Sequence, residues 1–126
     1  MLYKVCNTVY LIFDFMKFSS ELLKGTAELL VLQILLKNGE SYGYELVRSI
    51  AETSNNVFEF QEGTLYPLLY RLEARGYVES SKRLSPTGKD RRYYKITTPG
   101  TAVLKERRTE LGAFVRGLSA SLDLAV

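Results

Sequence analysis

Five cationic side chains crowd a short stretch of the chain on both sides of one turn: Lys82, Arg83, Lys89, Arg91 and Arg92. Lysine and arginine are the side chains that bind phosphate groups, through their charge and their N–H donors. Because like charges packed this closely repel one another, the cluster predicts a polyanionic partner. The alternative is that these charges serve only to keep the surface soluble.

The charge balance along the chain supports this prediction. Residues 1–70 carry five Lys/Arg and eight Asp/Glu, residues 71–108 carry eleven and four, and residues 109–126 carry one and two. The three segments therefore have net charges of −3, +7 and −1, and the overall +3 hides a basic block. Such a block is the electrostatic signature of phosphate contacts.

Other chemistries have little support in these 126 residues, which suffice for one small globular domain. With no histidine and a single cysteine, Cys6, the chain lacks the commonest general base and metal ligand and cannot form an internal disulfide. We find no Gly-rich phosphate loop, paired carboxylates or nucleophile elbow. We expect no enzymatic activity, no cofactor, no metal site and a cytoplasmic location; a Ser/Lys or acidic catalytic site is the remaining enzymatic alternative.

A helix is expected just before the cationic stretch. Its leucines form one apolar stripe at i, i+3, i+4 and i+7, which should face the core: Leu65, Leu68, Leu69 and Leu72. Pro67 belongs in the first turn or so, which places the helix start between Gln61 and Thr64, and Gly76 ends the helix. The other faces carry side chains suited to phosphates or base edges, unless they are simply solvated: Thr64, Tyr66, Tyr70 and Arg71.

Two strands are expected after this helix. Val78 and residues 93–96 have the β-branched and aromatic content of strands, and residues 85–88 (SPTG) between them are typical of a turn. The order helix, strand, basic wing, strand would supply a rod for the major groove of DNA and a charged ribbon for the neighbouring phosphates.

Two further helices precede this unit. Residues 26–37 are apolar almost all round, which predicts one side in the core and another against a second copy, with Leu30 and Ile34 at that interface. Ser41 is expected to cap a helix over residues 42–50. The predicted fold is therefore mainly α with a small β-hairpin: a winged helix-turn-helix domain plus a long C-terminal helix.

The C-terminal helix should begin at Thr98, a capping residue followed by proline, and reach about Leu122. At 1.5 Å per residue it would approach about 35 Å, longer than the body of a small domain. Its apolar stripe comprises Leu111, Phe114, Val115, Leu118 and Leu122. Dimerisation would bury this stripe; the alternative is that the helix folds back on residues 26–37 of its own chain.

Three segments are thus expected: an N-terminal extension over residues 1–15, a DNA-binding domain over 16–97 and a dimerisation helix over 98–126. The extension is apolar and aromatic but interrupted by Lys4, Asn7 and Asp14, and it is too short to cross a membrane and has no signal-peptide cleavage site. We interpret it as an adventitious or poorly integrated extension, with Met16 as the natural start. The alternative is an extra strand or helix that packs on the domain or its partner.

Four segments occur in order between residues 18 and 122: KGTAELLVLQILL, SYGYEL, EGTLYPLLYRLEARGYVES and GKDRRYYKITTPG. Together they resemble the PadR family of winged-helix transcriptional regulators, in its compact branch with a single C-terminal helix. The resemblance implies a homodimer that acts mainly as a repressor, binds double-stranded DNA at a pseudo-palindromic operator and is often released by a small molecule. It carries DNA contact onto Tyr42, Gly63, Thr64, Tyr66, Lys89, Arg91 and Arg92.

Compact family members that bind drugs between their dimer helices rely on a tryptophan. This chain has none, so Phe114 is the side chain on which a small aromatic inducer could stack. The alternative from another functional class is a protein-interaction module that docks through its tyrosine-rich face.

Overall fold

The computed structural model describes residues 18–19, 23 and 25–125. The expectations for an extension over residues 1–15 and a start at Met16 lie outside the described residues. The elements follow in the order α2 (Thr26–Asn38), β1 (Ser41–Tyr42), α3 (Gly43–Thr53), α4 (Glu62–Ala74), β2 (Val78–Leu84), β3 (Asp90–Ile96) and α5 (Thr98–Leu122). This confirms the mainly α winged helix-turn-helix fold with its long C-terminal helix.

The wing belongs to a three-stranded antiparallel sheet in the order β1-β3-β2. Val78 lies opposite Ile96 and Leu84 opposite Asp90 in the hairpin, while Ser41 pairs with Tyr94. Strand β1 was not predicted, and the expectation that Ser41 caps the second helix was wrong. Ser41 is buried in extended backbone, so Tyr42 is the N-cap instead and the helix begins at Gly43, with the Tyr42 N–H donating to Glu45 Oε1 at 3.2 Å.

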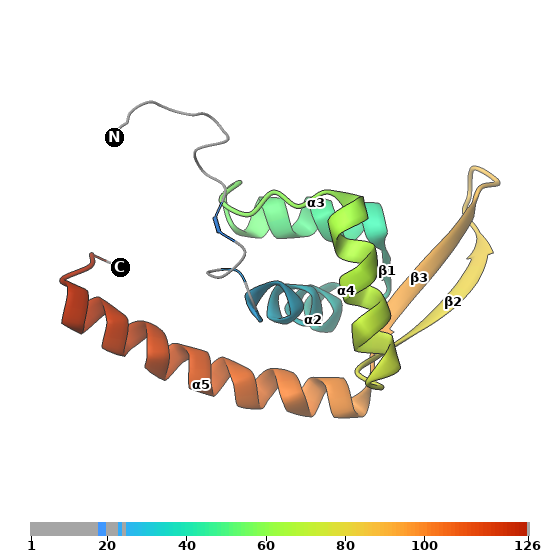
Figure 1. Ribbon diagram of the computed structural model, residues 1–126. Helices are drawn as coiled ribbons and strands as arrows, with labels where there is room; N and C mark the ends of the chain where they lie inside the picture. Colours follow the sequence, from blue (N-terminus) through green and yellow to red (C-terminus); the bar gives the residue numbers. More distant parts are fainter. Residues whose placement is uncertain (1–17, 20–22, 24, 126) are drawn as a thin grey trace.

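The core lies where α2, α3, α4 and the base of the sheet meet (Figure 1). The predicted leucine stripe of α4 is confirmed, since Leu65, Leu68, Leu69 and Leu72 are all buried. Residues from every other layer join them, among them Leu32, Leu35, Leu46, Ile50, Val78, Tyr94 and Leu104. Each fully buried leucine contributes about 1.5–3 kcal/mol relative to an exposed one, so this packing fixes the orientation of α4.

Helix α4 ends as expected, at a glycine. Gly76 has φ +81°, and a pair of backbone hydrogen bonds closes the end of the helix, from Gly76 N–H to Glu73 O and from Tyr77 N–H to Leu72 O, both 3.0 Å. Pro67 lies in the second turn, slightly deeper than expected. Because proline has no N–H, the carbonyl of Gly63 lacks its ordinary helical donor four residues on.

Helix α5 begins at Thr98 as predicted, but its N-cap lies one residue earlier than expected. Thr97, not Thr98, is the N-cap: its Oγ1 accepts from Gly100 N–H at 3.1 Å and donates to the Gly76 carbonyl at 2.6 Å. A Cβ on Gly100 would collide with the Tyr77 carbonyl oxygen, so the start of α5 is held tightly against the end of α4. Figure 1 shows α5 running along α2 and then extending past the body of the domain.

Candidate nucleic-acid interface

The N-terminal end of α4 is open to solvent. Gly63 and Thr64 are exposed, and a Cβ added to Gly63 would meet nothing within 4 Å. The first N–H groups of a helix have no intrahelical partner and carry a partial positive charge, which suits contact with phosphate oxygens or base acceptors. The Thr64 N–H donates to the Gln61 carbonyl at 3.0 Å, so this end of the helix offers a small profile and the N–H groups of Glu62 and Gly63.

The side chain of Tyr66 is turned towards α3 and does not point straight out from α4. A Cβ on Gly43, the first residue of α3, would lie 2.8 Å from Tyr66 Oη, so the absence of a side chain there makes room for the ring. The hydroxyl donates to Glu62 Oε1 at 3.2 Å. Partial burial, followed by this hydrogen bond and the charge of Glu62, raises the pKa of Tyr66 above its ordinary value, so the hydroxyl keeps its proton at neutral pH.

One face of the sheet carries interleaved tyrosine and arginine side chains. Strand β1 places Tyr42 opposite Tyr93, with their ring centroids 5.5 Å apart. The guanidinium of Arg91 lies 4.2 Å over the Tyr42 ring, and that of Arg83 lies 4.0 Å over the Tyr93 ring. Two residues expected separately at the interface, Tyr42 and Arg91, are thus in direct contact.

The other face of the hairpin is turned towards α4. Arg92 Nη1 donates to Ser80 Oγ at 3.0 Å, and Ser80 Oγ donates to Glu73 Oε2 of α4 at 2.8 Å. This chain of hydrogen bonds sets the position of the wing relative to α4. Lys89 lies exposed beside the turn, where the Gly88 φ of +88° allows the tight reversal.

The wing holds more positive charge than its own carboxylates neutralise. Arg83 pairs with Glu40 at 2.8 Å. In the described part of the chain, no carboxylate lies within 4.0 Å of the other four members of the cationic cluster: Lys82, Lys89, Arg91 and Arg92. Lys82 lies directly opposite Arg92, and Arg83 opposite Arg91, which destabilises the isolated hairpin. A polyanion bound along the wing would relieve this repulsion.

Arg71, which was expected to contact DNA, lies beside Glu28 of α2 with its side chain 53% exposed. Its Nε lies 3.6 Å from Glu28 Oε2, on α2, where Arg75 Nη1 and Arg107 Nη1 also approach at 3.2 and 3.5 Å. Glu28 is 8% exposed, so a charge in an otherwise apolar helix is compensated by three arginines from α4 and α5. In the sequence, the only signal for this cluster was Glu28 itself, an acidic residue in an otherwise apolar helix, because a buried carboxylate requires cationic partners.

Comparison with known proteins identifies the family of the chain. Residues 31–106 match the model of the transcriptional regulator PadR-like family. The chain belongs to the PadR-like family of transcriptional regulators.

Individual relatives agree with this assignment. A transcriptional regulator from Clostridium thermocellum is 30% identical, with a TM-score of 0.72 over 82% of this chain and 97% of that one. A PadR family transcriptional regulator from Eggerthella lenta is 34% identical, with a TM-score of 0.69 over 83% and 88%. Transcriptional regulator Rv3488 of Mycobacterium tuberculosis is 42% identical over 65 residues, 52% of this chain and 60% of that one.

Membership of this family makes the protein a transcriptional regulator and not an enzyme, and it implies DNA binding. Within the part of the chain that the structure describes, no helix combines the length and apolar character needed to span a bilayer.

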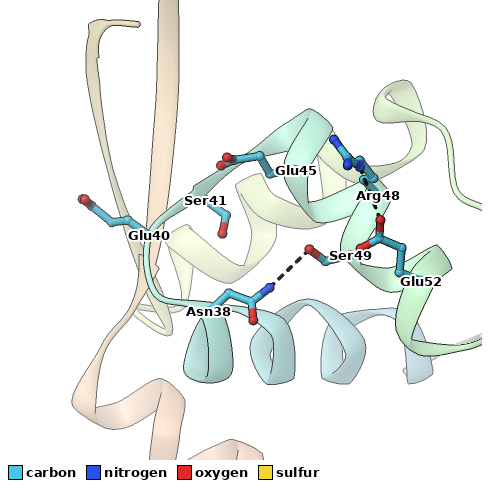
Figure 2. Close-up of a pocket in the computed structure, with 7 residues that line it drawn as sticks. All are labelled: Asn38, Glu40, Ser41, Glu45, Arg48, Ser49 and Glu52. Atoms are coloured by element: carbon cyan, nitrogen blue, oxygen red, sulfur yellow. Dashed lines mark hydrogen bonds and ion pairs between the residues drawn. The ribbon is translucent and has the colours of Figure 1, made fainter. Parts of the chain in front are cut away.

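Beside β1, this PadR-like regulator has an open polar pocket of about 250 Å³ between the end of α2 and α3 (Figure 2). Its lining residues are Asn38, Glu40, Ser41, Glu45, Arg48, Ser49 and Glu52. The carboxylates already have partners: Glu40 binds Arg83, Glu45 accepts from the Tyr42 N–H, and Glu52 lies 3.4 Å from Arg48 Nε. Glu45 joins the start of α3 to β1 and Glu40 joins the loop before β1 to β2, whereas the Arg48–Glu52 pair lies within α3. The surplus acidic charge of the lining disfavours phosphate here.

The C-terminal half of α5 exposes a continuous apolar stripe. Phe114 and Leu122 are each 61% exposed, Val115 42% and Leu118 40%, while Leu111 is half-buried. On α2, Leu30 is also half-buried and remains accessible, but Ile34 is 4% exposed and belongs to the core. Ile34 therefore has almost no surface to offer a second subunit, and its assignment to a dimer interface was wrong, because α2 turns that side towards its own domain.

Proposed function

We propose that this PadR-like regulator is a sequence-specific repressor that binds an inverted-repeat operator as a homodimer and is released by a small molecule. The observation that carries the proposal is the cationic cluster of the wing, four of whose side chains have no carboxylate partner among the described residues, on a hairpin that Ser80 joins to Glu73 of α4. DNA supplies the missing negative charge along the wing and a groove for the helix. In this proposal, residues 16–97 form the DNA-binding domain. The protein acts in the cytoplasm, where it meets its DNA.

The roles divide by chemistry. Lys89, Arg91 and Arg92 bind phosphates and set the register, and Tyr42 supports this by stacking under Arg91. Gly63 and Thr64 enter the major groove at the start of α4, where base edges determine specificity. Tyr66 braces α4 against α3, and Arg71 acts through Glu28, so both hold the groove-facing residues in place.

Residues 98–126 form the dimerisation segment in this proposal. The exposed stripe of α5 is apolar over three turns, and a surface of this kind on one long helix is buried most simply by the same helix of a second copy. A twofold dimer would hold its two α4 helices about one DNA turn apart, roughly 34–36 Å, and would require an inverted repeat.

An inducer would act at the same stripe. Phe114 is exposed on a single chain, and a small aromatic molecule stacked on its ring could change the spacing of the subunits. Such a ligand shifts the equilibrium only if it binds the released form more tightly than the DNA-bound form.

Selection of bound duplexes from a random pool by the purified full chain tests the proposal. The expected result is an enriched inverted repeat with half-sites about one helical turn apart, bound with an affinity that falls steeply with salt. Recovery of no duplex family, together with affinity for proteins that does not respond to salt, would instead favour a protein-interaction module that docks through exposed tyrosines such as Tyr44 and Tyr70.

A further inference from the structure

One line of residues on α4 points directly away from the core. Gly63, Pro67, Tyr70 and Ala74 follow one another at i, i+4, i+7 and i+11, and all four are exposed. The buried leucines of α4 occupy the opposite side of the helix. When the helix lies in a groove, this outward line is the part that reaches deepest.

Both flanks of the line are occupied by contacts within the protein. On one side, Tyr66 lies against Gly43 and Glu73 accepts from Ser80. On the other side, Arg71 and Arg75 pair with Glu28. The long side chains beside the line are therefore tied back to α2, α3 and the sheet, and the line itself is left to meet a partner.

Tyr70 is the single large side chain on this line. It is 75% exposed, more than any other large apolar or aromatic residue among the described residues, and within them its hydroxyl makes no hydrogen bond. Gly63, Pro67 and Ala74 are compact, so they allow the helix backbone to approach a groove closely around the Tyr70 ring. An aromatic ring left in water at this position gains free energy only when a partner covers it.

The major groove offers one apolar group, the C5-methyl of thymine. We propose that Tyr70 is a specificity-determining residue of α4 that packs its ring on a thymine methyl in each half-site. This inference rests on the proposed binding of α4 in the major groove. The exposed cations of the wing, on the same side of the domain as α4, would hold the phosphates while Tyr70 contacts the base (Figure 1).

The test removes the methyl group and the ring separately. In the operator selected by the wild-type chain, each thymine is replaced in turn by deoxyuridine, which lacks only the methyl. For the wild-type protein we expect a loss of about fourfold in affinity at one thymine per half-site, the value of one buried methyl group. For Tyr70→Ala, the same replacement should change nothing, whereas Tyr70→Phe, which keeps the ring, should remain sensitive.

Tyr44→Ala is the matched control, because Tyr44 is a 50% exposed tyrosine on α3, off the outward line of α4. It should keep the thymine sensitivity of the wild type. A Tyr70→Ala protein that retains this sensitivity at every thymine would overturn the inference while leaving DNA binding intact. A wild-type chain that selects no duplex would instead reject the proposed function. Since Tyr70 is exposed, its variants should melt at the wild-type temperature, which confirms that they fold.

Discussion

Arg91 lies over the ring of Tyr42, with its guanidinium carbon 4.2 Å from the ring centroid. A guanidinium that stacks on a ring directs its N–H groups outwards in its own plane, so it remains able to bind a phosphate while the ring restricts its motion. The contact depends on β1, which brings the start of α3 alongside β3. Two segments about 50 residues apart thus form one preorganised phosphate-binding surface.

The wing should govern the salt dependence of binding. Replacing Lys89, Arg91 and Arg92 by alanine should weaken binding to all duplexes similarly. It should also flatten the plot of log affinity against log salt concentration by about one unit per lost phosphate contact. The measurement is a salt titration of affinity for the selected operator and for a random duplex.

A charge-matched control distinguishes the effect of the wing cations from the effect of the net charge alone. Lys105, Arg108 and Arg116 are exposed on α5, and their triple alanine variant loses the same three charges away from the hairpin. It should retain a slope close to the wild-type value. If the two triple variants gave the same slope, the wing would have no special role in binding phosphates.

Thr64 should contribute to specificity and Tyr66 to positioning. Thr64→Ala should cost about 1–3 kcal/mol on the selected operator and much less on random DNA, because base contacts specify and phosphate contacts do not. Tyr66→Phe removes the hydrogen bond to Glu62 and should lower affinity for both duplexes by a similar, smaller amount. Equal losses on both duplexes for Thr64→Ala would show that Thr64 touches only the DNA backbone.

Glu28 should matter more to stability than an acid on the surface. Glu28→Gln leaves Arg71, Arg75 and Arg107 close together without their carboxylate. These arginines are about half-exposed and partly screened by water, so we expect a loss of about 1–2 kcal/mol in the free energy of unfolding. Glu52→Gln is the control, since its pair with Arg48 is 65% exposed on both sides and should be worth less than about 0.5 kcal/mol.

Chemical denaturation of both variants measures this difference. A Glu28→Gln protein as stable as Glu52→Gln would mean that the cluster contributes nothing to the junction of α2, α4 and α5.

The sequence predicted the elements whose pattern is local. The leucine period of α4, the turn before Lys89 and the proline after Thr98 each depend on a few neighbouring residues. Strand β1 has two residues, too few to show alternation, and exists because it pairs with β3. The caps shifted by a residue because backbone conformation decides them: Thr97 has the extended φ and ψ of an N-cap (−97° and 173°), although Thr98 is the same residue type.

Contacts between distant segments could not be predicted either, because the local sequence does not determine them. Glu28 meets arginines that lie 43 to 79 residues further along the chain, and no spacing rule links them. Helix α2 is apolar almost all round, so its sequence could not show that Ile34 faces the core while Leu30 stays partly accessible. The wing cations could be recognised as a group because they are close in sequence, but which face each one occupies follows from the register of the hairpin.

Assembly should depend on the exposed stripe of α5. Aspartate at both Phe114 and Leu118 should leave the single chain folded, because these side chains are 61% and 40% exposed in it, but would place unpaired charges in the seam of a dimer. We expect monomers with lost operator affinity, since the two α4 helices would no longer be held one DNA turn apart. Sedimentation and operator binding are the two measurements.

Ala113 and Ala120 supply the control. Both are exposed on the opposite side of α5, and their double aspartate variant adds the same charge to the same helix. It should remain dimeric and bind the operator at close to wild-type affinity. A Phe114→Asp/Leu118→Asp protein that sediments as a dimer and still binds the operator would place the interface elsewhere, and the proposed inducer site beside Phe114 would lose its route to the DNA-binding helices.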